Sequence, residues 1–287
     1  MSTPGQGLVL ATDLDGTMAH GDAGKRDRLA TLLREHQDAR LIYVTGRTPE
    51  AARVLAERVG LPVPDVLIAD VGTSVLRGLG PERVDAIEAE LDGLWPGGAV
   101  VRGRLAALAP ELVEQEVVAP RRVSYWVERV RRGRGPEPGA GDPFAARLPG
   151  DASLDEAAAA HAASLTRRAL ERLEGLGVDV LVSANVFLDV LPGGVDKGST
   201  LRRVLAWLGA SDDECVVAGD SINDLAMFET GMRGIVVANC EPALRRRAAT
   251  LDRVYQAAEE GVGGVLEGLR HHGHFAEGPE GGGTDGE

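Results

Sequence analysis

The sequence predicts an α/β protein with a Rossmann-like parallel sheet core and a smaller α+β domain inserted into it. Short β-branched apolar runs alternate with amphipathic stretches up to residue 80 and again from residue 191 onward. Two βα halves of this kind predict the strand order 3-2-1-4-5, with the first strand in the middle. The intervening residues break the alternation. We therefore expect a core of residues 1–80 and 191–270, an inserted domain of residues 81–190 and a disordered tail of residues 271–287.

The first half of the core contains three predicted strands and two predicted helices. Thr48 and Pro49 are residue types preferred at the N-cap and at the first position of a helix. The predicted strands cover residues 8–12, 41–45 and 66–69, the helices residues 25–36 and 49–59, and residues 71–77 are expected to form a small hairpin.

The second half repeats this alternation. The predicted helices cover residues 199–208 and 222–229, and the predicted strands cover residues 215–219 and 235–238. Short, continuous apolar runs bounded by turn residues are typical of strands that are buried on both faces of a parallel sheet.

The inserted segment reads as helix, strand, helix and hairpin. Ser153 and Glu156 form a capping-box pattern that opens an Ala-rich helix reaching about residue 173. The Gly-, Pro- and Arg-rich residues 131–152 are expected to form a flexible insertion. A helix face is marked by Val84, Ile87, Leu91 and Leu94, a strand is predicted over residues 123–130, and a hairpin over residues 178–182 and 186–191.

Composition limits the possible partners. The net charge is −13 and the pI about 5.0, which argues against nucleic acid or an anionic membrane as a main partner. No apolar run approaches the roughly 20 residues that a membrane span requires. Residues 1–7 lack the pattern of a signal peptide, and Cys215 and Cys240 are predicted at opposite ends of the sheet. We expect a reduced, cytoplasmic protein that is a monomer or a weak dimer.

Residues 8–17 are the most informative segment, because an apolar run ends there in Asp13 and Asp15. Residues two apart on an extended chain point to the same side. Both carboxylates are therefore predicted together at the carboxyl end of a strand, where α/β folds bind ligands. Crowded carboxylates stay ionised only when a cation or a donor neutralises them. A turn with an aspartate near a helix start is the alternative interpretation.

Lysine is rare in this chain, and its position is informative. Only Lys25 and Lys197 are lysine among 31 basic residues. Lys197 precedes a predicted helix, where a positive charge opposes the helix dipole. A bound phosphate would reverse the sign of that interaction. A solvated surface lysine is the alternative.

Further polar residues follow two other predicted strands. Thr45 ends the second strand, and Asp220 ends the strand that begins at Cys215, with Asn223 and Asp224 just beyond it. This set of segments, in this order, resembles the four signature motifs of the haloacid dehalogenase (HAD) superfamily of Mg-dependent phosphohydrolases. The resemblance covers residues 8 to 269 approximately. The inserted domain lies where this superfamily places its type IIB (C2B) cap, and residues 123–127 and 186–197 look most similar to sucrose-phosphate phosphatases within the sucrose-phosphate and Cof-like branch.

The resemblance implies a role for each of these residues. Asp13 would attack phosphorus to form an aspartyl-phosphate, and Asp15 would protonate the leaving sugar oxygen and then activate water. Mg²⁺ is the implied cofactor. Its implied ligands are Asp13, Asp15 (through its carbonyl), Asp220 and Asp224 (directly or in a supporting role), and the implied phosphate-binding residues are Thr45, Gly46, Lys197 and Asn223.

Several of these residues have plainer interpretations. Thr45 could be an ordinary strand residue, Asp220 could only cap a helix, and Arg47 could contact substrate or be solvated. His271, His272 and His274 could bind a metal, although a solvated tail is expected. The candidates for sugar contacts in the cap are Tyr125, Ser183 and Asn185, whose polar groups could equally face water.

The favoured function is that of a sugar-phosphate phosphatase acting on a small-molecule phosphorylated sugar. A phosphomutase of the α-phosphomannomutase type shares the cap and motifs and is the alternative. A non-catalytic phosphosugar-binding module would have lost one of Asp13, Asp15, Lys197 or Asp220, and all four are present. Substrates of the sucrose, trehalose, glucosylglycerol or pseudosugar phosphate kind stay open.

Overall fold

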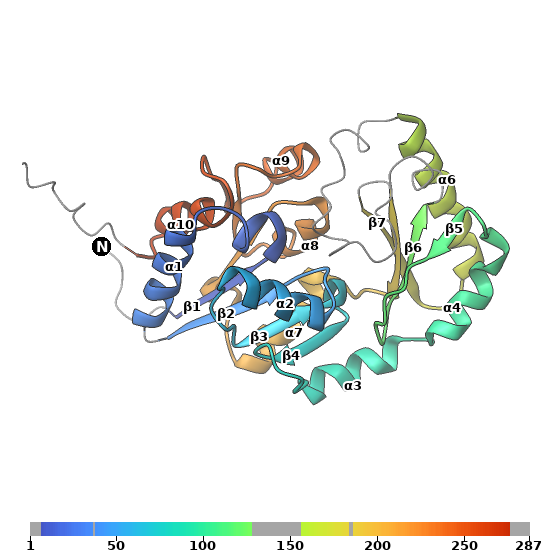
Figure 1. Cartoon of the computed structure of the whole chain (residues 1–287), viewed down its shortest axis with the longest axis horizontal. Helices are drawn as coiled ribbons and strands as arrows, with labels where there is room; N and C mark the ends of the chain where they lie inside the picture. Colours follow the sequence, from blue (N-terminus) through green and yellow to red (C-terminus); the bar gives the residue numbers. More distant parts are fainter. Residues whose placement is uncertain (1–6, 37, 128–155, 184–185, 276–287) are drawn as a thin grey trace, which may run out of the picture.

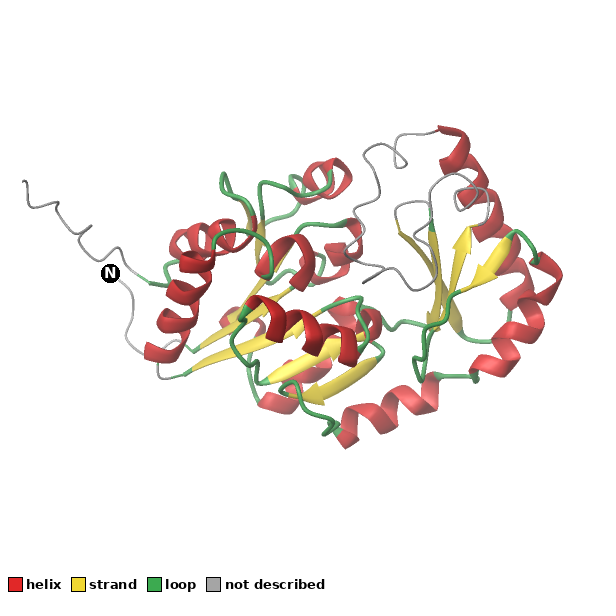
Figure 2. Cartoon of the chain, in the orientation of Figure 1, coloured by secondary structure: helices red, strands yellow, loops and turns green. Residues whose placement is uncertain are grey.

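The computed structural model describes residues 7–36, 38–127, 156–183 and 186–275. Two layered units lie side by side (Figure 1). The larger contains a seven-stranded sheet with helices on both faces, and the smaller contains a four-stranded sheet (Figure 2). The predicted fold class, an α/β core with an inserted α+β unit, is confirmed.

The predicted strand order is present inside the larger sheet. Its order is β11-β10-β9-β1-β2-β3-β4, and β1 (Leu8–Thr12) pairs in parallel with β2 (Ala39–Val44) and β9 (Cys215–Gly219). The remaining strands are β3 (Val66–Ala69), β4 (Ser74–Arg77), β10 (Arg233–Val236) and β11 (Val254–Gln256). Only β4 in this sheet is antiparallel to its neighbour.

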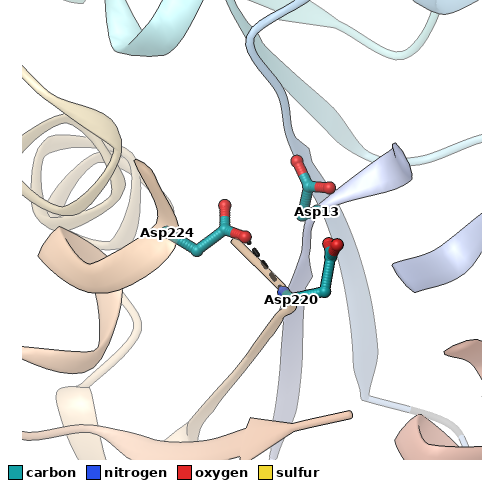
Figure 3. A group of neighbouring side chains, drawn as sticks. All are labelled: Asp13, Asp220 and Asp224. Carbon is teal, nitrogen blue, oxygen red and sulfur yellow. Dashed lines mark hydrogen bonds between the residues drawn. The ribbon is translucent and has the colours of Figure 1, made fainter. Parts of the chain in front are cut away.

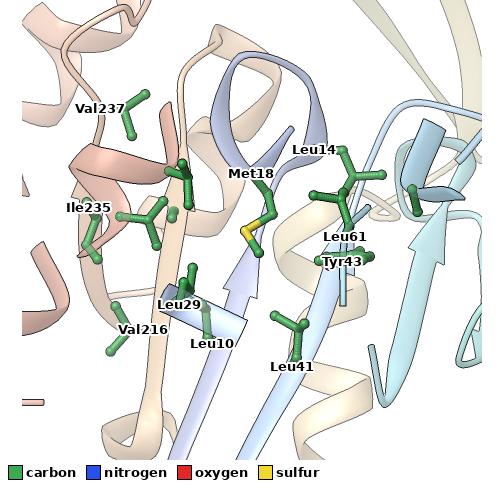
Figure 4. Close-up of a cluster of buried hydrophobic side chains, with 14 of the residues drawn as sticks. Leu10, Leu14, Met18, Leu29, Leu41, Tyr43, Leu61, Val216, Ile235 and Val237 are labelled. Carbon is green, nitrogen blue, oxygen red and sulfur yellow. The ribbon is translucent and has the colours of Figure 1, made fainter. Parts of the chain in front are cut away.

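Both faces of this sheet are buried, which explains the continuous apolar runs. Leu8 and Leu10 face one apolar cluster and Val9 and Ala11 face the other. The first cluster is covered by α1 (Ala23–Glu35), α2 (Pro49–Val59) and α10 (Gly261–His271), and part of it is drawn in Figure 4. The second is covered by α3 (Asp85–Leu94), α7 (Lys197–Leu208), α8 (Leu225–Phe228) and α9 (Pro242–Ala248).

The cap has an apolar core of its own. Its antiparallel sheet has the order β5-β6-β8-β7, from β5 (Leu112–Glu114), β6 (Val123–Val127), β8 (Phe187–Pro192) and β7 (Val178–Ser183). Two helices, α4 (Gly98–Leu105) and α6 (Glu156–Leu173), lie on the side of this sheet turned away from the larger unit (Figure 1). Among the described residues, the cap cluster shares no member with the two core clusters.

Several element boundaries differ from the predictions. The helix expected from residue 199 begins at Lys197, because the Asp196 side chain caps its first turn. The strand expected over 235–238 begins and ends two residues earlier. Helix α3 lies within the predicted cap, yet Val84, Ile87 and Leu91 pack in a core cluster. Helix α4 and strand β5 have no counterpart among the predicted elements, since glycines and arginines obscure the apolar periodicity of α4.

Residues 271–275, predicted to belong to a disordered tail, are ordered. Helix α10 extends through His271, whose ring stacks on Tyr255, and the His272 ring lies 3.0 Å from the carbonyl oxygen of Gly234. His274 is buried. These contacts cover the edge of the sheet at β10 and β11, and the three histidines do not converge as metal ligands within the described part of the chain. The predictions for residues 128–130, 131–152, Ser153, Asn185 and 276–287 lie outside the described residues.

No helix in the described ranges is both long enough and apolar enough to cross a bilayer.

Separate apolar cores predict separate responses to cavity mutations. Leu188 is fully buried in the cap cluster, so Leu188→Ala should lower the free energy of unfolding of the cap by about 2–5 kcal/mol. Hydrogen exchange should show faster exchange in β6 and β8 and unchanged protection in β1. Leu10→Ala, in the core cluster, is the matched control and should have the opposite pattern. Equal loss of protection in both units would show a single cooperative core.

Candidate active site

The site lies at the carboxyl edge of the larger sheet, where the segments after neighbouring strands meet. Asp13 follows β1, Thr45 follows β2, and Asp220 follows β9. Lys197 is the first residue of α7 and reaches the same edge. These are residues that the sequence predicted would converge, and their location matches the usual ligand-binding edge of an open α/β sheet.

Lys197 links two of the acidic residues. Its Nζ lies 2.7 Å from Asp13 Oδ1 and 2.6 Å from Asp224 Oδ1, and the residue is 1% exposed. Burial alone would lower the pKa of Lys197, but the two carboxylates raise it above its ordinary value. Lys197 is therefore a permanent buried cation, and the interpretation as a solvated surface lysine is wrong.

Three carboxylates point into one small space (Figure 3). One oxygen from each of Asp13, Asp220 and Asp224 lies within 4.8 Å of the others. Burial raises the pKa of Asp13 well above its usual range, and burial together with Asp224 raises the pKa of Asp220 to about 8. Lys197 supplies one positive charge against these acids. The oxygen-only donor set and the excess negative charge fit a hard divalent cation such as Mg²⁺.

Asp224 differs from the other two acids because its oxygens already accept several hydrogen bonds. Its Oδ2 accepts from the backbone N–H of Asp220 and of Ser221 and from the Ser221 hydroxyl, each at 3.0 Å. Its Oδ1 accepts from Lys197. This arrangement favours Asp224 as the residue that orients Lys197 and the loop after β9, and it leaves Asp13 and Asp220 as the better cation ligands. Asn223 Oδ1 lies 2.5 Å from the Ser221 hydroxyl and shares its single proton with Asp224 Oδ2.

Gly16 allows the loop after β1 to approach Asp220 closely. Its φ is +71°, and a Cβ at this position would lie 2.2 Å from Asp220 Oδ2. Thr17, in the helical turn that follows, donates its hydroxyl to Asp220 Oδ1 at 2.9 Å. Any side chain at position 16 would therefore strain the backbone and displace the Asp220 carboxylate from the acidic cluster.

Asp13 and Asp15 lie near each other, since the charge of Asp15 contributes to the raised pKa of Asp13, but they are not both on a strand as predicted. β1 ends at Thr12, and the chain turns at once into the segment Leu14–Met18, whose Leu14 and Met18 pack in the core (Figure 4). The Asp15 carboxylate instead accepts from Arg47 Nε at 2.7 Å and Nη2 at 2.6 Å. The two acids of this loop are thus held by different cations.

Arg47 and Thr45 form the neighbouring loop after β2. Arg47 is 2% exposed, so the alternative of a solvated arginine is wrong. Thr45 lies just past the end of the strand, is fully buried, and accepts from the Arg47 N–H at 3.1 Å through its hydroxyl oxygen. The Arg47–Asp15 pair fixes this loop against the loop that carries Asp13 and Asp15. Gly46, between Thr45 and Arg47, is partly exposed.

In the cap, Tyr125 does not face the site. It is 6% exposed and packs in the cap core with residues of α4 and α6. Residues alternate across a strand, so Ser124 and Trp126 lie on the other face of β6. There, Trp126 packs on Phe187 with ring centroids 4.8 Å apart, and Ser124 donates to Asp189 at 2.5 Å. Side chains alternate between the two faces of a strand, so Trp126 would be predicted on this face if the face of any one residue of β6 were known from the sequence.

The structure neither supports nor contradicts the prediction that Ser183 and Asn185 contact the sugar. Ser183 pairs with Phe187 in the register of β7 and β8, and Asn185 lies outside the described residues. Two residues that the sequence did not single out are Arg121 and Arg122, which are buried at the boundary between cap and core. They have no local sequence signature, because their partners are distant along the chain.

The acidic cluster predicts an unusual dependence of stability on pH. Without a divalent cation, folded Asp220 keeps its proton up to about pH 8, whereas the unfolded residue loses it near 3.8. The folded state therefore binds more protons in this window, and the free energy of unfolding should fall as the pH rises through it. In EDTA at pH 8, Asp220→Asn should melt higher than the wild type, whereas exposed Asp27→Asn should not. Added Mg²⁺ should raise the wild-type Tm more than that of Asp220→Asn. A flat pH profile for the wild type would contradict this.

Comparisons with known proteins agree with this geometry. Residues 6–133 and 153–273 match the family model described as sucrose-6F-phosphate phosphohydrolase. The chain is 31% identical over 270 residues to the mannosylfructose-phosphate phosphatase of Agrobacterium fabrum, covering 92% of this chain and 96% of the relative. It is 34% identical over 270 residues to the glucosylglycerol-phosphate synthase of Pseudomonas anguilliseptica, covering 94% of this chain. It spans only 31% of that synthase and 60% of tobacco sucrose-phosphatase 1.

Solved structures show the same fold. The sucrose-phosphatase of Synechocystis sp. PCC6803, in complex with sucrose and phosphate, superposes with a TM-score of 0.74 at 25% identity, covering 94% of this chain and all of that one. A HAD subclass IIB sugar phosphatase superposes with a TM-score of 0.60 at 12% identity, covering 93% of this chain and all of that one, and so shows the shared fold alone. The chain thus belongs to the sucrose-6F-phosphate phosphohydrolase family.

Proposed function

We propose that this protein hydrolyses the phosphate monoester of a small sugar, with Asp13 as nucleophile and Asp15 as general acid and base. The observation that carries the proposal is that these two acids of one loop are held by different cations, Lys197 and Arg47. Two carboxylates on one loop can take different roles when their environments differ.

The reaction divides into two displacements. An Asp13 carboxylate oxygen attacks phosphorus, the bond from phosphorus to the sugar oxygen breaks, and Asp15 gives its proton to that oxygen. Asp15 then removes a proton from water, which attacks phosphorus, releases inorganic phosphate and frees the Asp13 carboxylate. Hydrolysis of phosphate monoesters is among the slowest uncatalysed reactions, so both a nucleophile and proton transfer are needed.

The remaining residues manage negative charge. Mg²⁺, held by Asp13 and Asp220, would keep Asp13 ionised and withdraw charge from the phosphate oxygens. Lys197 adds a fixed cation beside Asp13 and lies at the positive end of α7. The hydroxyl of Thr45 and the backbone N–H of Gly46 are suited to donate to the phosphate.

The relatives support the sugar class of the substrate. The names of two relatives specify phosphorylated disaccharides, of sucrose and of mannosylfructose. We infer that the substrate is a disaccharide phosphate or a molecule of that shape. We further infer that the enzyme is cytoplasmic and that this small molecule is its direct partner.

The side of the cap sheet that carries Ser124 and Trp126 is suited to bind the sugar. Trp126 and Phe187 are partly exposed, in a chain with only 3% aromatic residues, and they pack together on this face. Ser124 and Asp189, two residues along the same strands, add hydroxyl and carboxylate groups. Aromatic surface with a few fixed polar groups is typical of small-molecule sites.

The reaction itself is tested with a panel of phosphorylated sugars, with Mg²⁺ and with EDTA. The wild type should release phosphate only with the cation, and Asp13→Asn should release none, because an amide does not attack phosphorus. The variant should stay folded, since it removes one of several crowded acids. Turnover by a well-folded Asp13→Asn would contradict the nucleophile assignment. Isomerised sugar phosphate without net phosphate release would identify a mutase instead.

Sugar recognition by the cap is tested with Trp126→Leu. A lost aromatic contact is worth about 0.5–1.5 kcal/mol, so kcat/KM for the sugar phosphate should fall about 2- to 13-fold. Hydrolysis of p-nitrophenyl phosphate, which carries no sugar, should change little. Tyr125→Phe, on the opposite face of the same strand, is the matched control and should leave both substrates unaffected. Equal losses for both substrates in Trp126→Leu would place sugar recognition elsewhere.

A further inference from the structure

The boundary between cap and core is polar. In the described residues the apolar clusters of the two units are separate, whereas two consecutive buried arginines, Arg121 and Arg122, connect them just before β6. Arg121 donates to the Thr73 carbonyl at 2.7 Å and to Glu88 at 3.0 Å. Arg122 donates to the Gly46 carbonyl at 3.2 Å and to Asp70 at 2.9 Å. Only the second arginine contacts the loop that follows β2.

That loop is held through three successive carbonyl groups. The Thr45 carbonyl accepts from the Val71 N–H at 3.1 Å, and the Arg47 carbonyl accepts from the Asp70 N–H at 2.8 Å. The Gly46 carbonyl, between them, accepts from Arg122. Two of the three contacts come from the core and the middle one comes from the cap.

The core residues of this arrangement have a strained backbone. Asp70 and Val71 have φ values of +52° and +61°, a region that non-glycine residues and β-branched residues above all rarely adopt. Asp70 is fully buried and accepts from Ser74 at 3.0 Å as well as from Arg122. Removal of the Arg122 guanidinium would leave a buried carboxylate without its cation and would release the constraint on this turn.

A displacement of loop 45–47 would move the groups proposed to react, because Arg47 in this loop contacts Asp15. Arg47 holds Asp15 through two hydrogen bonds, and Thr45 and Gly46 are the residues of this loop proposed to bind the phosphate. Arg122 also lies 3.8 Å from Asp189, which is on the proposed sugar-binding face of the cap. Its Nε has no hydrogen-bond partner among the described residues, an arrangement that stability alone does not favour.

We propose that Arg122 is a positioning residue through which the docked cap sets the geometry of the phosphate-binding loop 45–47. The proposal rests on the proposed function and adds that the cap serves every substrate, including one too small to touch its sugar-binding face. Displacement of a reacting group by about 1 Å can cost about 100-fold in rate.

The test compares Arg122→Gln with Arg121→Gln. Both remove a buried guanidinium and its ion pairs, so both should lower Tm, but only Arg122 touches the loop. For Arg122→Gln, kcat should fall about 100-fold for the sugar phosphate and for p-nitrophenyl phosphate alike. Arg121→Gln should keep a kcat close to wild type. Arg122→Lys should recover part of the loss, because lysine keeps the charge without the planar fork.

A second measurement is independent of turnover. Inorganic phosphate with Mg²⁺ should raise the Tm of the wild type and of Arg121→Gln, and should raise that of Arg122→Gln much less. If the wild type hydrolyses none of the esters but shows this shift, the proposed reaction fails while the shift still decides the role of Arg122. If Arg122→Gln does not fold, Arg122→Lys with Arg121→Lys gives the same comparison. Equal kcat values for the two positions, or unchanged hydrolysis of p-nitrophenyl phosphate in the Arg122 variant, would overturn the proposal.

Discussion

The ammonium group of Lys197, buried between Asp13 and Asp224, is the contact on which the site depends. The lysine needs both carboxylates to remain charged away from water, and each carboxylate needs the lysine. The partners lie 184 and 27 residues from it along the chain, so the contact exists only when β1, α7 and the turn after β9 have their final positions. One ion triad therefore ties the position of Asp13 to the assembly of both halves of the core.

Small residues let the charged groups come this close. A Cβ on Gly198 would lie 2.1 Å from the Ala226 carbonyl oxygen, so glycine allows the first turn of α7 to pack against α8. Lys197, the preceding residue, is thereby brought beside Asp224, whose other oxygen caps the turn after β9. Gly16 has the same effect for the loop after β1. Backbone approach and charge pairing are thus consequences of one packing arrangement.

Predictions from the sequence were accurate where the signal is local. Buried parallel strands appear as apolar runs, and Thr48 caps α2 as its residue type indicates. Strand alternation does not apply to Asp13 and Asp15, because β1 ends at Thr12 and no local feature shows that end. The sequence does not show which of Tyr125 and Trp126 faces the cap core, because adjacent aromatic residues hide the phase of a short strand. Arg122 was missed because its partners Gly46 and Asp70 lie 76 and 52 residues away.

The packing within the two units and the contacts between them have different functions. Apolar packing in the core and in the cap makes each unit stable but specifies orientation weakly, because the hydrophobic effect is non-directional. The arginine forks between the units are directional, since each guanidinium presents its donors in a fixed plane. Ion pairs of this kind add little net stability after desolvation. Their value here lies in geometry: Arg122 places a cap residue one hydrogen bond from the loop of Thr45, Gly46 and Arg47, and two from the Asp15 carboxylate.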